Sequence, residues 1–502
     1  MKSFSVRIAS SLAASALVSV GMLWGQSPSS KSSKNANRSN IDDSNTTERS
    51  LRVDNLIAMA QSAPPEVAVD LLLTLASSEL IIKKERKREL IEQAFQIAEK
   101  VREPVRRKSW GLIVDTRSGL KQAAFDLELD KLSAQSKAVG QMIALDRLRA
   151  KQMFEDITLP PMKPLTCEDS LGYVLDSYYR AMLSVAEQCF DADERKAGIH
   201  IQFLSARLGN VKSVAQVTPA LRILSDAKQS PDELSLLVNV LTEALGRVSG
   251  DARSFAFAIE RDRLISTADG LISKLKEHDV PTNEFGRAVR SFLIKNMSGE
   301  VCADVTWLKD GQPSVPPDLA ARTNEFATPI NADDLRPSTV GPPAPEVIFW
   351  KTPKAAALLK SAKSLRFGGG TKELSPEQRE TDEWHQKLVD FLQLLASWEP
   401  ESEPSSADYF QERCIMYYVL VDLCPNDAQR DVVLRAYGNY LKETNGEYKG
   451  RIGWILPVKT YLRVLRAKSD AVRRMSLDPW LTSSDESLRI YAELALLTSP
   501  KS

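Results

Sequence analysis

The chain has 502 residues, of which 43% are hydrophobic and 26% are charged, as in globular proteins with a sizeable buried core. Its 66 basic residues balance 66 acidic residues, so no overall positive field exists to attract phosphates, which argues against a dedicated nucleic-acid-binding protein. Only 7% of the residues are aromatic, and glycine and proline are slightly less frequent than average, so the composition favours helices over sheets.

Residues 1–25 have the layout of a secretory signal peptide. Lys2 and Arg7 form a short basic region, residues 8–24 form an uncharged run of small and apolar residues, and Gly25 marks a suitable cleavage point. The run is about as long as the shortest membrane-spanning helices, so the alternative is an uncleaved anchor. No later stretch is apolar enough to cross a bilayer, so we expect an exported protein, periplasmic or extracellular, with no transmembrane span after cleavage.

Residues 26–50 contain almost nothing that a folded core could bury. Ala36 and Ile41 are the apolar residues among serines, asparagines and charges. Such a composition is typical of disordered segments, so this stretch is predicted to be a disordered polar tether.

From Leu51 onward the apolar residues recur with the period of an α-helix. In residues 87–101, Ile91, Phe95 and Ala98 form one stripe, and the residues beside that stripe are Leu90, Ala94 and Val101. Charged residues fill the opposite face, so a helix with one buried face is predicted.

Residues 230–250 contain the start signals of a helix as well as its periodicity. Ser230 is a typical N-cap, Pro231 suits the first helical position, and acidic residues follow at the positive end of the helix dipole. The expected buried face consists of Leu234, Leu237, Leu241, Leu245 and Val248. Residues 374–398 open in the same way, with Ser375 before Pro376.

Comparable segments fill residues 51–300 and 375–497, joined by short breaks, and no strand pair with a hairpin signal is evident. The predicted fold class is therefore all-α: an irregular helical-repeat, α-solenoid-like array of antiparallel helix pairs. No fixed repeat length is present. We expect an N-terminal helical-repeat domain over residues 51–300 and a C-terminal helical domain over residues 351–500.

Residues 301–350 interrupt this pattern, because they hold eight of the 26 prolines. Long proline-rich stretches inside compact proteins are usually linkers or functional loops. The segment also carries several large apolar residues. We therefore expect an extended connection packed on a surface, separating the two helical domains.

The five cysteines fall into two groups. Cys189, Cys414 and Cys424 lie on apolar helical stripes, which predicts buried core thiols. Cys167 and Cys302 lie outside such stripes and beside proline-rich breaks, so they are candidates for a disulfide in an oxidising compartment. The alternative of two free thiols stays open.

No motif indicates a metal, a cofactor or a nucleophile. His200, His278 and His385 lie in distant segments, and zinc-type cysteine or histidine spacings are absent from the sequence. No Gly-x-Ser-x-Gly occurs, and residues 368–374 lack the phosphate-loop spacing. The neighbours Glu383, Trp384 and His385 point in different directions on a helix, so Trp384 is predicted to face the core. We expect no cofactor and no metal.

Two sets of residues are candidates for binding a partner. Large aromatic side chains are common interface anchors, and the candidates are Trp110, Tyr178, Tyr179, Trp307 and Trp350. A basic stretch offers a docking patch for an acidic partner, formed by Lys83, Lys84, Arg86, Lys87, Arg88, Arg106, Arg107 and Lys108. The alternative for the basic stretch is a solvated helix face with internal ion pairs.

These features together favour an exported, non-catalytic helical scaffold that binds another protein or peptide in the cell envelope. The alternative is an all-α envelope enzyme that acts on glycans through a pair of carboxylates, which the sequence alone does not locate. No nucleic-acid partner is expected.

Overall fold

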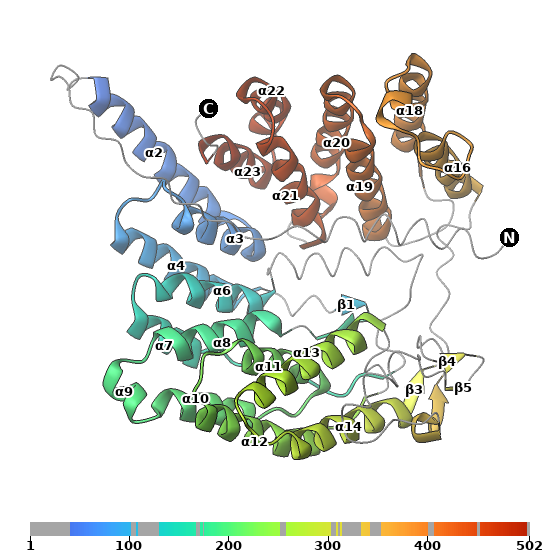
Figure 1. Cartoon of the computed structure of the whole chain (residues 1–502). Helices are drawn as coiled ribbons and strands as arrows, with labels where there is room; N and C mark the ends of the chain where they lie inside the picture. The colour runs from blue at the N-terminus through green and yellow to red at the C-terminus, as the bar shows by residue number, and fades with distance from the viewer. Residues whose placement is uncertain are drawn as a thin grey trace. The chain divides into compact units, whose positions relative to one another are not determined.

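A computed structural model of the whole chain shows an all-α protein with a few very short strands (Figure 1), which confirms the all-α part of the predicted fold class. The structure describes residues 41–101, 107–108, 130–166, 171–173, 175–251, 258–302, 308–309, 312–313, 333–341, 353–399, 406–448 and 452–498. In these residues no helix is both long and apolar enough to cross a membrane.

The chain divides into two compact units. Residues 83–347 form one, here called the central unit, and residues 1–82 together with 348–502 form the other, here called the terminal unit. This division differs from the predicted one, because residues 51–82 group with the C-terminal helices instead of with residues 83–300.

The central unit is a succession of helices that pack mainly on their neighbours along the chain. In this unit α6 contacts α7 and α8, α8 contacts α10 and α11, α11 contacts α13, and α12 contacts α14. Its helices are α4 (Lys84–Ala98), α6 (Lys131–Ile143), α7 (Arg147–Glu155), α8 (Asp176–Gln188), α9 (Ala192–Lys196), α10 (Ile199–Leu208), α11 (Val214–Asp226), α12 (Pro231–Arg247), α13 (Ala258–Glu277) and α14 (Asn283–Ser298).

The strands of the central unit are two or three residues long and pair two by two. The antiparallel pairs are β1 (Arg107–Lys108) with β2 (Leu171–Gly172) and β4 (Leu308–Lys309) with β5 (Gln312–Pro313). The parallel pair is β3 (Glu300–Cys302) with β6 (Thr339–Gly341), and a 3-10 turn, η2 (Asp333–Leu335), precedes β6. The described part of residues 301–350 is thus largely extended.

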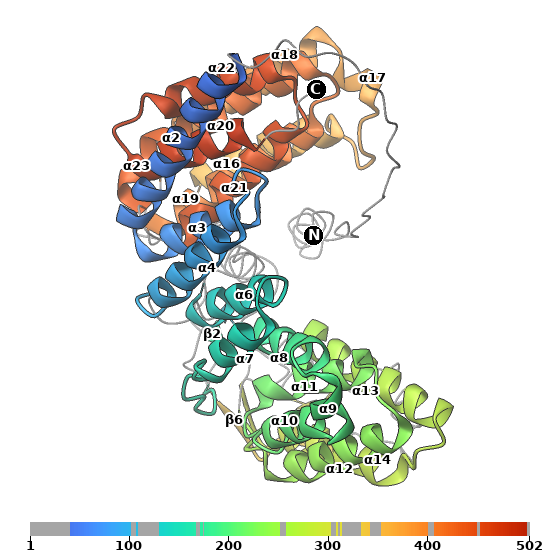
Figure 2. The same cartoon turned by 90° about the vertical axis from the view of Figure 1, so that its left-hand side faces the viewer.

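The terminal unit is a second succession of helices, closed by the two ends of the chain. In this unit α16 contacts α18, α18 contacts α20, and α20 contacts α22. Helix α19 lies beside α20 and α21, and α2 lies alongside α23 (Figure 2). Its helices are α2 (Ile41–Ser62), α3 (Pro65–Ser77), α16 (Pro353–Phe367), α17 (Pro376–Arg379), α18 (Asp382–Ala396), α19 (Ser406–Leu423), α20 (Asp427–Tyr448), α21 (Ile452–Arg466), α22 (Asp470–Leu481) and α23 (Glu486–Leu497).

A buried charged cluster ties α3 to the C-terminal helices. The Asp70 side chain is 1% exposed; its Oδ1 lies 2.5 Å from the Lys459 Nζ on α21, and its Oδ2 accepts a hydrogen bond from the Tyr491 hydroxyl on α23 at 3.0 Å. Burial, and then the Asp70 charge, raise the pKa of Tyr491 well above its ordinary value. An unpaired buried carboxylate is strongly destabilising, so these contacts explain why α3 belongs to the terminal unit.

The expected tether is wrong over residues 41–50, which form the first turns of α2. Later in this helix Val53, Leu56, Ile57 and Ala60 are buried. Once a helix is anchored by such packing, each further residue adds a backbone hydrogen bond at low cost, so polar residues can extend it. Residues 26–40 lie outside the described residues.

The predicted helix patterns are confirmed in detail. The apolar stripe of residues 90–101 is buried, and so is the predicted face of α12 from Leu234 to Val248. Ser230 accepts a hydrogen bond from the Glu233 backbone, and Glu233 accepts one from the Ser230 backbone, which completes a capping box. Ser375 caps α17 as predicted, but Thr381 caps a second helix, α18, so this segment is two helices.

Basic side chains repeatedly cover the C-terminal end of a neighbouring helix. Lys274 donates to the carbonyl oxygens of Leu224, Ser225 and Ala227 at the end of α11, at 2.9, 3.0 and 2.6 Å. The same contact is made by Arg195 on α8, Arg247 on α10, Lys295 on α12, Arg413 on α18, Arg430 on α19 and Arg473 on α21. A cation there satisfies free carbonyls and the negative end of the helix dipole.

Candidate functional site

Two of the five predicted binding aromatics lie in the hydrophobic core. Tyr178 and Tyr179 are 7% and 2% exposed. The Tyr178 ring stacks on Phe154 with ring centroids 5.1 Å apart, and the Tyr179 ring packs edge-on against Tyr178. The structure therefore corrects their predicted role as exposed anchors, since neither ring is available to a partner.

Several other predicted residues lie outside the described residues. These are Trp110, Trp307 and Trp350 among the aromatics, Arg106 in the basic stretch, and Cys167. For Arg107, Lys108 and Cys302 the structure describes the backbone alone. The disulfide between Cys167 and Cys302 and the three tryptophan anchors remain predictions.

The described part of the basic stretch is partly engaged in ion pairs. Arg86 pairs with Glu89 at 3.0 Å, and Arg88 pairs with Asp146 of the central unit at 2.9 Å. Lys83 and Lys84 are exposed at the start of α4. These pairs fit the alternative interpretation, a solvated helix face, better than a dedicated docking patch.

The three cysteines predicted to be core thiols are free and buried, as predicted. Burial raises the pKa of Cys189 to about 11 and that of Cys424 to about 12, and it raises the pKa of Cys414 well above the ordinary value. A thiol with a raised pKa carries little thiolate near neutral pH, so these positions are poor nucleophiles.

The Glu383-Trp384-His385 sequence contributes to the core and to the helix surface. Trp384 is 3% exposed, and its indole nitrogen donates to the Leu365 carbonyl at 2.8 Å. Glu383 forms an ion pair with Lys387 one turn away. In the part of the chain that the structure describes, no group of three or more histidine, cysteine or acidic residues is placed to hold a metal ion.

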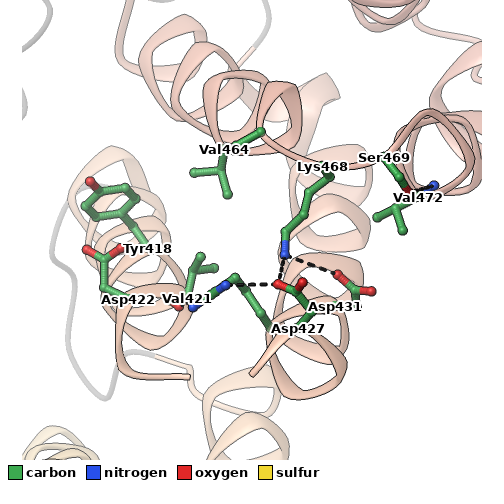
Figure 3. Close-up of a pocket in the computed structure, with 11 residues that line it drawn as sticks. Tyr418, Val421, Asp422, Asp427, Asp431, Val464, Lys468, Ser469 and Val472 are labelled. Atoms are coloured by element: carbon green, nitrogen blue, oxygen red, sulfur yellow. Dashed lines mark hydrogen bonds and ion pairs between the residues drawn. The ribbon is translucent and has the colours of Figure 1, made fainter. Parts of the chain in front are cut away.

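The terminal unit contains a solvent-open pocket of about 440 Å³ where the turn between α19 and α20 meets the turn between α21 and α22 (Figure 3). It combines an apolar wall, one aromatic ring and several charges. Its lining consists of Tyr418, Val421, Asp422, Asp427, Arg430, Asp431, Val464, Ala467, Lys468, Ser469 and Val472.

At one end of the pocket the charges neutralise each other. The Lys468 side chain is 10% exposed, and its Nζ contacts Asp427 and lies 4.0 Å from Asp431. Arg430 also pairs with Asp427, at 3.0 Å, and it donates to the Cys424 carbonyl at the end of α19. The hydrogen bond from Lys468 is the main cause that lowers the pKa of Asp427. The charges at this end of the pocket are therefore paired within the protein.

At the other end Tyr418 and Asp422, one turn apart on α19, lie side by side (Figure 3). No hydrogen bond or ion pair reaches the Asp422 carboxylate from any residue that the structure describes. Asp422 is an exposed residue, and partial loss of water in the pocket raises its pKa, against the opposing charges of Arg430 and Arg463. The pocket therefore presents an acid without a close partner.

The sequence contains a signal for this pocket in the phase of the α19 residues. Tyr417 and Cys414 are buried, but Tyr418 is only half-buried and falls out of phase with them. A tyrosine and an aspartate four residues apart outside a core stripe share one helix face. That spacing marks the exposed face of α19.

Comparison with protein-family models, with curated proteins and with solved structures found no match for this chain. The functional interpretation therefore depends on the geometry of the two units and of the pocket.

Proposed function

We propose that this protein is an exported, non-catalytic helical scaffold that binds another protein or peptide in the cell envelope. The observation that carries the proposal is the packing order of the helices. In both units each helix contacts mainly the next helix or the next but one along the chain. Arrays of this kind expose long continuous surfaces, and repeat proteins use such surfaces to hold partners.

The pocket at the α19–α20 and α21–α22 turns supports the same function. Partner binding at protein surfaces usually depends on a concave site that mixes apolar and aromatic contacts with a few polar groups. The pocket offers three valines, one tyrosine and an unpaired carboxylate. In this proposal residues 1–25 are the export signal, and residues 26–40 are the part of the predicted tether that precedes α2.

The test is chemical crosslinking in whole cells, followed by affinity purification of the tagged full-length protein. We expect a reproducible envelope protein in the purified material that stays bound at moderate salt. A protein recovered alone, with sugar fragments instead of a protein partner, would contradict the scaffold.

One observation favours the alternative, an envelope enzyme acting on glycans. Asp422 has a raised pKa and Asp427 has a lowered pKa, and they line opposite ends of one pocket. Two carboxyl groups with pKa values shifted in opposite directions are the pattern of an acid and base pair. Release of soluble fragments from envelope glycans, abolished by Asp422→Asn and by Asp427→Asn alike, would establish the enzyme.

A further inference from the structure

We infer that the pocket of the terminal unit binds a lysine or arginine side chain of the partner, with Asp422 as the ion-pair acceptor and Tyr418 as its aromatic neighbour. The inference rests on the scaffold function proposed above and names the chemistry of the partner.

The charge balance of the pocket points to a cation. Three aspartates and two basic residues line it. Lys468 and Arg430 are both engaged with Asp427, and Asp422 at the opposite end has no hydrogen bond or ion pair with any residue that the structure describes. The Oδ1 of Asp431 is buried and accepts no hydrogen bond, but it lies 4.0 Å from the Lys468 Nζ. The lining therefore has one more acid than base, so it favours an incoming cation over an incoming anion.

The apolar part of the pocket suits the stem of a basic side chain. Lysine and arginine bury a chain of methylene groups along apolar surface and place the charge at its tip. Val421 and Val464 provide such a surface beside the Tyr418 ring (Figure 3). A tyrosine ring adds a favourable interaction with a cation that lies over its face. A small inorganic cation would leave this wall unused.

The chain also contains a competitor for the same acceptor. Arg463, an exposed residue on α21, lies close enough to Asp422 to lower its pKa, but no ion pair within 4.0 Å joins the two side chains. Removal of this arginine should make Asp422 more available, with Arg430 as the remaining opposing charge. The inference therefore predicts opposite effects for two substitutions at the same site.

The experiment is a titration of the purified full-length protein with fluorescently labelled nona-arginine and nona-lysine peptides, followed by anisotropy. Nona-glutamate serves as the anionic probe. We expect Asp422→Asn to weaken binding of the basic peptides about tenfold, because it removes a charge-assisted contact worth about 1.4 kcal/mol. Arg463→Gln should strengthen binding of the same peptides, and nona-glutamate should not bind.

Two matched controls lie on α22 outside the pocket lining. Asp478→Asn and Arg474→Gln make the same charge changes at exposed positions. Both should bind the basic peptides as the unaltered protein does. Equal effects of Asp422→Asn and Asp478→Asn, or weaker binding after Arg463→Gln, would overturn the inference, because binding would then follow overall charge alone.

Crosslinking of the same variants in cells separates this inference from the scaffold proposal. If the unaltered chain and Asp422→Asn capture a protein partner equally, the inference that the pocket binds a basic side chain is overturned and the scaffold proposal stands. Loss of that partner in Asp422→Asn, with retention in Asp478→Asn, supports both. Absence of any partner with the unaltered chain contradicts the scaffold, whatever the peptides show.

Discussion

At the scale of single residues, His200 is the best-placed reporter of pH. Its Nε2 lies 3.4 Å from Glu233, and its side chain is 12% exposed. Burial lowers the pKa of His200, Glu233 opposes this effect, and Arg195 adds to it, so the net shift is downward. The unfolded chain therefore takes up a proton at this position before the folded chain does, and the folded state loses stability as pH falls through the ordinary histidine range.

We predict that His200→Gln makes the protein less sensitive to mild acid. The free energy of unfolding should fall less between pH 7.5 and pH 5.5 in this variant than in the unaltered protein, because one group that favours the unfolded state is gone. Urea unfolding at the two pH values measures the difference. A larger fall in the variant would contradict the assigned direction of the pKa shift.

Single residues also show where sequence reasoning succeeds and where it fails. The burial of Cys189, Cys414 and Cys424 follows from local helical period, because each lies on a continuous apolar stripe. Whether Tyr178 and Tyr418 are buried depends on which other helices pack against them. Phe154 of α7 stacks on Tyr178, and Phe203 of α10 packs on Phe154, but the α21–α22 turn leaves Tyr418 at a pocket. Local patterns do not contain that information.

At the scale of elements, the recurrent feature is the basic side chain that covers the end of another helix. The chain has no fixed repeat length, yet this contact recurs in both units. The sequence distance from the capped carbonyl to the basic residue ranges from six residues for Arg430 to 50 for Lys274. A contact that recurs at variable spacing leaves no periodic signature in the sequence.

We predict that Lys274→Met lowers the free energy of unfolding by about 2 kcal/mol, because three carbonyl oxygens lose a charged donor. Lys276→Met, at an exposed position of the same helix, is the control and should change stability by less than about 0.5 kcal/mol. Urea unfolding of both variants measures the effect. Equal stability of the two variants would show that the cap contributes nothing.

The pair of short strands β4 and β5 has a signal in the sequence. β4 and β5 are separated by Asp310 and Gly311, a pair typical of two-residue hairpin turns. These strands have only two residues each, too few to give an alternating pattern in the sequence. In contrast, capping signals such as Ser230 with Glu233 act within one turn, so they predict helix starts reliably.

At the scale of the whole molecule, the two ends of the chain belong to one unit. Asp70 and Tyr491 are 421 positions apart and share a hydrogen bond. The composition changes in the proline-rich segment, so the sequence predicts a domain boundary there. It could not place α2 and α3 with the C-terminal helices, since that grouping depends on long-range contacts.

We predict that Asp70→Ala loosens the C-terminal helices selectively. Removal of one partner of a buried ion pair costs about 3–5 kcal/mol, because Lys459 and Tyr491 lose their acceptor. Amide hydrogen exchange should become faster in α21 and α23 and stay unchanged in α12 of the central unit. Asp478→Ala, at an exposed position, is the control. An unchanged rate of amide hydrogen exchange in α23 would contradict the role of Asp70 in joining α3 to the C-terminal helices.

The central claim is that the terminal unit binds a protein partner through the pocket of Figure 3. The most direct measurement places a photo-crosslinking amino acid at Tyr418 and, as a control, at Met475, which is 58% exposed in the same unit. After irradiation of whole cells, the account predicts one reproducible protein adduct from position 418 that position 475 does not give. No protein adduct from position 418, or the same adducts from both positions, would contradict it.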